Sequence, residues 1–436
     1  MTSSPPARGA RAVLATGIVL GVAMLVSMAA TRSHMLAANF EVYRVAAEAV
    51  LAGEDFYAVA PDRFPDFYYL YPPITVLTFL PFAAVGLWTG FAIHTLLEVA
   101  VGLALAWVIV RWIERERSLE RLDYALIAGF VVGSIHTVPS LVYGQVNLRM
   151  ALLVAVGLWL LERSHTVESS PLSHSHEPGA RLEFLAGVAL AGAALLKVFP
   201  AAIGVLLLHL RAWRAVAGAL VTGLGGLALG ALLFGAGRTR QFFVDVLFPR
   251  TDDEAFVGGL EPSAAYVTVR RPISVLTPEI EPTLYTVFAL AVLAPPVAYV
   301  YTDLETSTDR LVAAHATLVA IFVFFPSYPL YYPIVFATLV PALYLVVDPL
   351  ARWLLVAGAL LANVVLMGPT LESVVLAAPP AIGGPLETVG FAVLTVASPV
   401  LLGCLVMVAG CVVYRYRRSR GIADGDRSGR SRRTSS

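Results

Sequence analysis

Charged residues are scarce in this sequence. Asp, Glu, Lys and Arg make up 14% of its 436 residues, whereas an ordinary soluble domain carries roughly 25%. Hydrophobic residues reach 58% and lie in long runs rather than in amphipathic stripes. Because about 20 consecutive apolar residues suffice to span a bilayer as a helix, this composition excludes a soluble domain and predicts an all-α, polytopic membrane protein.

Cysteine and the motifs of soluble enzymes are also nearly absent. The two cysteines, Cys404 and Cys411, share a helix face, but a bridge between them would have to reach across two turns, so no disulfide framework is expected. The sequence contains no GxGxxG before a helix, no P-loop, no HExxH, no GxSxG and no CxxC pair. His174 and His176 resemble a metal-binding tract, but their Ser- and Pro-rich surroundings are typical of a solvated linker.

Lysine occurs only once. Lys197 lies inside the apolar stretch 185–210, and the other 29 of the 30 basic residues are arginines. A charge at membrane depth is costly unless it has a partner or reaches an aqueous cavity. The sequence therefore predicts a functional site at Lys197, with an anionic partner.

The apolar runs predict about 12 membrane crossings. Two runs, 72–110 and 183–210, contain proline and are expected to be broken, the second at Lys197 and Pro200. A further helix over 41–53 is expected to lie on the membrane surface. The runs cover approximately residues 12–30, 72–110, 122–140, 146–162, 183–210, 213–235, 284–301, 309–326, 329–348, 350–367 and 389–414.

Arginine placement predicts the orientation in the cell membrane, because basic loops stay in the cytoplasm. It favours one transmembrane domain over 1–414 with both termini cytoplasmic, followed by a basic, disordered tail over 415–436. Two long loops, 31–71 and 236–283, would then be external. A competing arrangement, which puts four arginines on the unfavourable side, has these segments outside: 111–121 and 163–182.

Polar groups gather at the run ends on the predicted external face. Taken singly, Gln145 and Asn147 could cap a helix, Lys197 could snorkel to the interface, and the tyrosines could form an interfacial belt. Taken together, a cation, amides, aromatics and a carboxylate would suit glycosyl transfer from a lipid phosphate. The segments concerned are 39–43 with Asp55 and Tyr57, 144–147, 197–200 and 327–332.

The order of these motifs resembles glycosyltransferase family 87, whose members have the GT-C fold. The resemblance runs from about residue 12 to 345. It rests on NFEVYRVAAEAVLAGEDFY (39–57), YLYPPITVLTFLPFA (69–83), GQVN (144–147) and LAGVALAGAALLKVFPAAIGVLLLHLRAWR (185–214). It implies inverting transfer of a hexose, often mannose, from a polyprenyl-phosphate donor to an acceptor outside the cell.

The resemblance also implies roles for particular residues. The family pattern has an Asp where this chain has Asn39, and an amide cannot serve as a carboxylate base. Glu41 is the expected substitute, with Asp55 as the next candidate. Substrate binding is expected from Lys197 with Arg270 or Arg271 on the donor phosphate, from Gln145 and Asn147 on sugar or phosphate oxygens, and from Tyr43, Tyr71, Tyr328 and Tyr331.

The expected partners are the lipid-linked sugar donor, a lipid, glycan or glycoprotein acceptor, and membrane lipids, with no nucleic acid. No cofactor is required, although a divalent metal is compatible with the chemistry. Two alternatives stay open. A secondary transporter also combines broken helices with a buried charge, and the Asn39 departure suits a non-catalytic lipid-binding protein.

Overall fold

The computed structural model describes residues 7–168, 177–251 and 254–421, and within them the secondary structure is helical, apart from one antiparallel bridge between Val267 and Ser327. The helices are α1 (Ala7–Thr31), α2 (Ala38–Ala52), α3 (Leu80–Ala83), α4 (Leu87–Glu114), α5 (Arg121–Gly133), α6 (Thr137–Tyr143), α7 (Asn147–Glu168), α8 (Glu177–Leu196), α9 (Gly204–His209), α10 (Trp213–Phe234), α11 (Ala236–Gln241), α12 (Arg270–Leu276), α13 (Thr283–Val300), α14 (Ser307–Phe324), α15 (Phe336–Leu345), α16 (Pro349–Ala362), α17 (Gly368–Ala377), α18 (Pro380–Val396) and α19 (Pro399–Ser419).

Short 3-10 and π turns join several of these helices. They are η1 (Ser33–Met35), η2 (Pro73–Thr78), η3 (Phe199–Ile203), η4 (Phe242–Leu247), η5 (Phe248–Thr251), η6 (Glu254–Phe256) and η7 (Pro329–Val335).

The structure confirms an all-α chain built for a membrane. Among the described residues, 7 helices are long and apolar enough to cross a bilayer, or up to 8 if the bent pair α5 and α6 is one span. Four shorter apolar helical segments accompany them: 199–209, 329–345, 349–362 and 381–396. The count of about 12 crossings stays a prediction.

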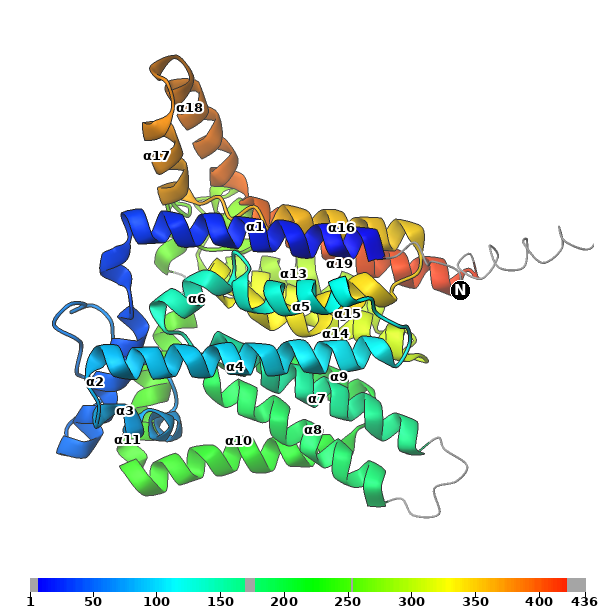
Figure 1. The fold of residues 1–436 in the computed structure, drawn as a ribbon, viewed down its shortest axis with the longest axis horizontal. Helices are drawn as coiled ribbons and strands as arrows, with labels where there is room; N and C mark the ends of the chain where they lie inside the picture. Colours follow the sequence, from blue (N-terminus) through cyan, green and yellow to red (C-terminus); the bar gives the residue numbers. More distant parts are fainter. Residues whose placement is uncertain (1–6, 169–176, 252–253, 422–436) are drawn as a thin grey trace, which may run out of the picture.

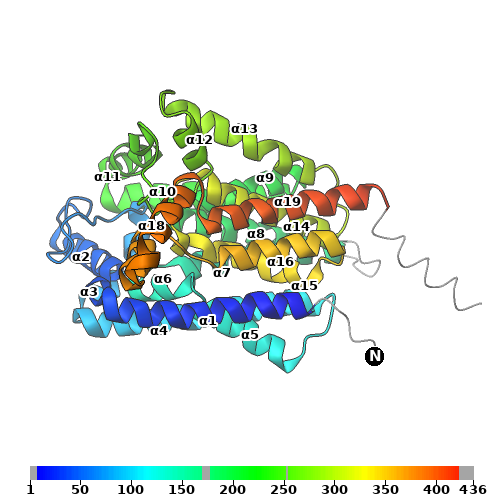
Figure 2. The ribbon, with the colours of Figure 1, turned by 90° about the horizontal axis from the view of Figure 1, so that it is seen from above.

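The long helices run side by side as one bundle (Figures 1 and 2). The small helices α2, α3 and α11 gather at one end, called the outer end here, and the α17–α18 hairpin projects sideways from the same end. The start of α1 and the end of α19 both lie at the opposite, inner end. The two ends of the described chain therefore share one end of the bundle, as an even number of crossings requires.

Both predicted helix breaks are present. The run 72–110 divides into η2, α3 and α4, and the run 183–210 divides after Leu196 into η3 and α9. Pro200 explains the second break, because it has no N–H to donate to the carbonyl of Leu196, four residues earlier, and its ring would crowd that carbonyl in a continuous α-helix. The break leaves Lys197 at the outer end of α8.

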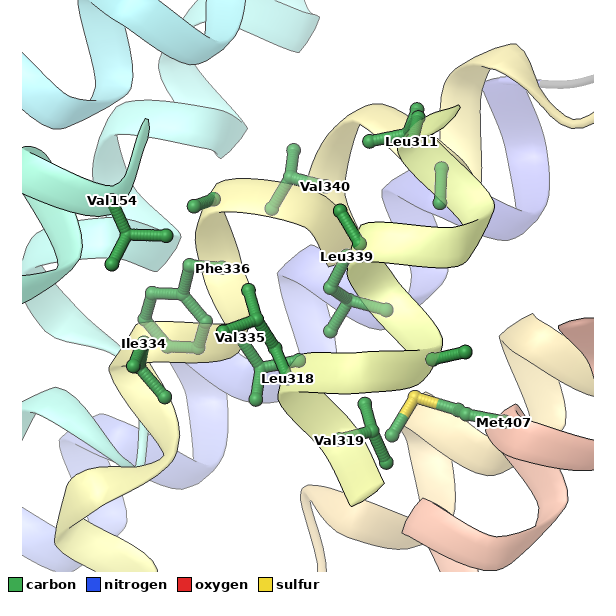
Figure 3. Packing of buried hydrophobic residues seen from close by; sticks show 14 of the residues in the cluster. Val154, Leu311, Leu318, Val319, Ile334, Val335, Phe336, Leu339, Val340 and Met407 are labelled. Atoms are coloured by element: carbon green, nitrogen blue, oxygen red, sulfur yellow. The ribbon is translucent and has the colours of Figure 1, made fainter. Parts of the chain in front are cut away.

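Helix α14 is the centre of the bundle, with 72% of its apolar stretch buried. In Figure 3, Leu318 of α14 lies among Val154 of α7, Phe336 of α15 and Met407 of α19. This packing fixes the segment between α14 and α15, because side chains in a dense core have little freedom to shift. That segment carries Tyr331.

The predicted tail begins inside a helix. Helix α19 continues to Ser419, and near its end Arg417 and Arg418 pair with Asp348 and Asp309 at 2.6 and 3.0 Å. Residues 422–436, with most of the predicted tail, lie outside the described residues, as do His174 and His176.

Candidate active site

Lys197 lies where three elements meet. Its Nζ atom donates a 2.8 Å hydrogen bond to Oδ1 of Asn147, at the start of α7. The same atom lies 3.4 Å from the ring centroid of Tyr331, in η7, which is cation–π geometry. The lysine predicted to mark a functional site is thus held beside groups from α7 and η7.

The side chain of Asn147 is fixed on both sides. Asn147 is fully buried, and its Nδ2 donates to the carbonyl of Leu330 at 2.7 Å and to Oγ of Ser140 at 3.1 Å. These two bonds use both amide protons. The carbonyl oxygen is therefore oriented toward Lys197, which is more than a helix cap would need.

The turn before Asn147 depends on Gly144. Its φ of +73° lies in the left-handed region, and a Cβ atom there would come within 2.6 Å of Cβ of Phe40. Only glycine meets both demands without strain. The turn brings Gln145 and Asn147, both buried, to the same side as α2.

A tyrosine pair extends the cluster from Gln145. The hydroxyls of Tyr43 and Tyr71 are 2.8 Å apart, and they donate to Oε1 of Gln145 at 3.2 and 3.4 Å. Burial raises the pKa of Tyr43 well above its ordinary value, so its phenol stays protonated and remains a donor. The tyrosine ring is also stacked on Phe79 at 4.4 Å.

Tyr328 stands at the edge of the cluster. Its ring packs against Tyr331 at 5.9 Å and against Tyr266 at 5.1 Å. The bridge between Val267 and Ser327 fixes this approach. Tyr328 is 38% exposed, so it belongs to the rim of the site rather than to its interior.

The structure does not bring Glu41 into this cluster. Its carboxylate accepts a 2.9 Å bond from Arg63, which also donates to the carbonyl of His34 at 2.9 Å. Glu41 precedes Tyr43 by two residues and so lies on the other side of α2, whereas Asn39 precedes Tyr43 by a full turn and shares its face. The assignment of Glu41 as base stays a prediction, and the geometry gives it less support than the phosphate site.

Asp55 is also held away from Lys197. It pairs with Arg238 and accepts bonds from the amide of Tyr57 at 2.9 Å and from Gln241 at 3.2 Å. Burial raises the pKa of Asp55, but the hydrogen bonds and the charge of Arg238 outweigh it, so the pKa lies below its ordinary value. Asp55 therefore ties the 54–71 segment to α11.

The two arginines of α12 have different surroundings. Arg271 is 2% exposed and donates to the carbonyls of Glu261 at 3.0 Å, Leu394 at 3.1 Å and Ala264. Burial lowers the pKa of Arg271 to about 10, so it stays charged at neutral pH. Arg270 lies over the ring of Phe324 at 5.0 Å. Arg271 therefore joins backbone segments, while Arg270 points to the outer end of α14.

If Arg271 has a structural role, its replacement should lower the stability of the protein. Arg271→Gln is expected to cost about 2–4 kcal/mol of stability, because a buried carbonyl left without a donor costs about 1–3 kcal/mol. The purified protein should melt at a lower temperature, with the KM for a polyprenyl-phosphate donor unchanged. Arg240→Gln, at an exposed arginine of the same end, is the control. Unchanged melting with a raised donor KM would instead support the phosphate role read from the sequence.

Sequence reasoning missed one buried charged group. Glu98 of α4 pairs with Arg149 of α7, and Arg149 also donates to Nδ1 of His94 at 3.2 Å. His94 packs on Phe40 at 5.2 Å, beside the Gly144 turn. Glu98 and Arg149 are charges inside apolar runs, which is the same signal that drew attention to Lys197.

No group of three His, Cys, Asp or Glu side chains that could hold a metal ion occurs within residues 7–168, 177–251 and 254–421. The cluster instead combines one cation, two amides and several phenols. Such a set can bind a phosphate by charge and hydrogen bonds, and can pack a sugar or an isoprenoid against aromatic rings.

Comparison with known proteins places these residues in a family. The sequence profile described as Glycosyltransferase family 87 matches residues 69–327, more than half of the chain. The matched range includes Gln145, Asn147 and Lys197, but it begins after α2 and so leaves out Asn39 and Glu41.

Among solved structures, ArnT from Cupriavidus metallidurans bound to undecaprenyl phosphate is similar at 15% sequence identity. The similarity covers 91% of this chain and 76% of that chain, with a TM-score of 0.43. No curated protein matches the chain significantly. The extent of the profile match confirms the resemblance read from the sequence: the chain belongs to glycosyltransferase family 87.

Proposed function

We propose that this protein transfers a hexose, such as mannose, from a polyprenyl-phosphate donor to a lipid, glycan or glycoprotein acceptor outside the cell. The observation that carries the proposal is the cluster around Lys197. Four separate segments of the chain bring Tyr43, Tyr71, Gln145, Asn147 and Lys197 together, and a fifth places Tyr331 beside the lysine. Membership of a glycosyltransferase family gives this cluster a matching chemistry.

The donor phosphate is proposed to sit against Lys197. An ammonium group binds a phosphate as a point charge. The attraction between the two charges is stronger where water is excluded. As the acceptor oxygen bonds to the anomeric carbon, the bond from that carbon to the phosphate oxygen breaks and leaves its electron pair on the polyprenyl phosphate. The proton of the acceptor hydroxyl passes to a carboxylate base or to water. Lys197 is placed to stabilise this developing charge. The tyrosine hydroxyls and Gln145 would then hold the sugar.

The site is proposed to face the outside of the cell. Basic residues flank the inner end of α4 and α5 at Arg111, Arg115, Arg117 and Arg121, and such clusters stay in the cytoplasm. Lys197 ends α8 at the opposite, outer end. A lipid-linked donor suits this location because it needs no nucleotide site.

Transfer of labelled hexose from polyprenyl phosphate tests the proposal. The purified full chain in lipid vesicles, supplied with the lipid-linked sugar and a membrane extract containing acceptors, is expected to release polyprenyl phosphate and to label an acceptor. Vesicles without the protein are the control. Accumulation of a solute in protein-containing vesicles without any lipid donor, together with no sugar transfer, would overturn the proposal in favour of a transporter.

A further inference from the structure

An apolar groove of about 630 Å³ runs along the side of the bundle between α9, α13 and α14. It opens toward the lipid-facing surface, where Val205 is 53% exposed and Leu290 is 56% exposed. The groove follows α13 from Leu290 to the end of that helix and continues to Thr302 in the next turn. The helical part, residues 290–300, corresponds to a length of roughly 15 Å.

The outer end of the groove lies near two cations, Arg270 and the Lys197 of the candidate site. Phe324 lines this end, and the Arg270 guanidinium lies over its ring. On the other side of the groove, the lining includes Ala202 of η3. The same turn carries Phe199, whose ring centroid lies 6.4 Å from that of Tyr331. Tyr331 in turn carries the ammonium group of Lys197. An anionic group at this end would therefore meet positive charge.

The inner end of the groove is polar. The hydroxyl of Tyr301 lies 2.7 Å from Oγ1 of Thr317, and His209 packs edge-on against the Tyr301 ring at 5.2 Å. A hydrocarbon chain that covered these polar groups would gain no binding free energy, because it cannot form hydrogen bonds with them. The lining thus has an apolar middle, cations beyond one end and hydroxyls at the other.

We propose that this groove binds the isoprene units of the donor lipid nearest its phosphate, an assignment that rests on the proposed function. A single long hydrocarbon chain ending in a compact phosphate matches one apolar groove whose outer end lies near buried Arg270 and partly buried Lys197. The lateral opening lets the chain enter from the bilayer, and the length of the groove leaves the rest of the lipid in the membrane. Burial of apolar surface supplies the affinity.

Photolabelling tests occupancy without requiring sugar transfer. A polyprenyl phosphate carrying a diazirine on the isoprene next to the phosphate is irradiated with the full chain in phosphatidylglycerol vesicles. Labelling is expected in peptides covering 290–302 and 317–324, and excess unlabelled polyprenyl phosphate should abolish it. Labelling that extra phosphatidylglycerol removes equally well would show that ordinary membrane lipid fills the groove, and labelling elsewhere would also overturn the proposal.

Two variants that fill the groove with a large side chain test whether it contributes to donor binding during sugar transfer. Ala294 and Ala298 line it and are exposed, so Ala294→Trp and Ala298→Trp fill it from one wall. Each is expected to raise the KM for the long-chain donor by about tenfold or more, through lost apolar burial, with little change in kcat. Ala291→Trp, exposed on α13 but outside the lining, is the control.

The two readouts separate the possible failures. Wild-type transfer with unchanged KM in both groove variants and no photolabel in the groove would refute the groove while the proposed function stands. Specific photolabelling without any transfer by the wild-type protein would refute the proposed function while polyprenyl phosphate still binds in the groove.

Discussion

Lys197→Met is expected to lower kcat for hexose transfer by roughly 10²–10³-fold, the loss seen when one preorganised donor to a developing charge is removed. Methionine retains an unbranched apolar side chain that can pack near Tyr331, but it has no ammonium group to meet the phosphate. The bond that Lys197 donates to Asn147 is lost as well. Labelled hexose transfer by the purified chain in vesicles measures the effect.

Two further variants at the same place sharpen the result. Lys197→Arg keeps a charge but changes its shape, and is expected to retain more activity than Lys197→Met without reaching the wild-type rate. Val198→Ala changes the neighbouring, 43% exposed residue and should transfer normally. If a well-folded Lys197→Met protein transfers hexose at more than half of the wild-type rate, Lys197 is not the phosphate-binding residue.

Part of the cluster around Lys197 could be predicted from the sequence, because its residue types are energetically unfavourable inside an apolar run unless they have specific partners. A lone lysine in an apolar run, a proline beside it and a glycine before two amides each demand an explanation at membrane depth. In the structure, Lys197 contacts Asn147 and Tyr331. Gln145 accepts a hydrogen bond from Tyr43. Glu98 and Arg149 carried the same signal and were overlooked, although they form a buried pair.

Other features depend on contacts that a linear pattern does not contain. Arg271 looked like a phosphate partner, but its bonds go to carbonyls from the 261–266 segment and from α18, more than a hundred residues away in sequence. The pairing of Glu41 with Arg63 joins α2 to a loop. Only the register of α2 was readable in advance, since residues 39 and 43 share a helix face and residue 41 does not.

That register leads to the second large effect. Asn39→Asp is expected to raise kcat by about tenfold or more, because a positioned general base contributes roughly 10²–10⁴-fold and an amide cannot accept the acceptor's proton. Asn39 is half-buried and lies one turn before Tyr43. The new carboxylate would therefore face the cluster that contains Gln145 and Lys197. Initial rates at saturating donor and acceptor measure the change.

Glu41→Gln is the matched comparison, since it removes a carboxylate from the same helix without changing its length. Its effect on kcat is expected to stay within about threefold, because the structure engages Glu41 with Arg63 on another face of α2 and glutamine can still accept that bond. A loss of more than a hundredfold in a well-folded Glu41→Gln protein, with no gain from Asn39→Asp, would make Glu41 the base. Helix α2 would then have to turn or shift when substrate binds, because its present register points the two residues apart.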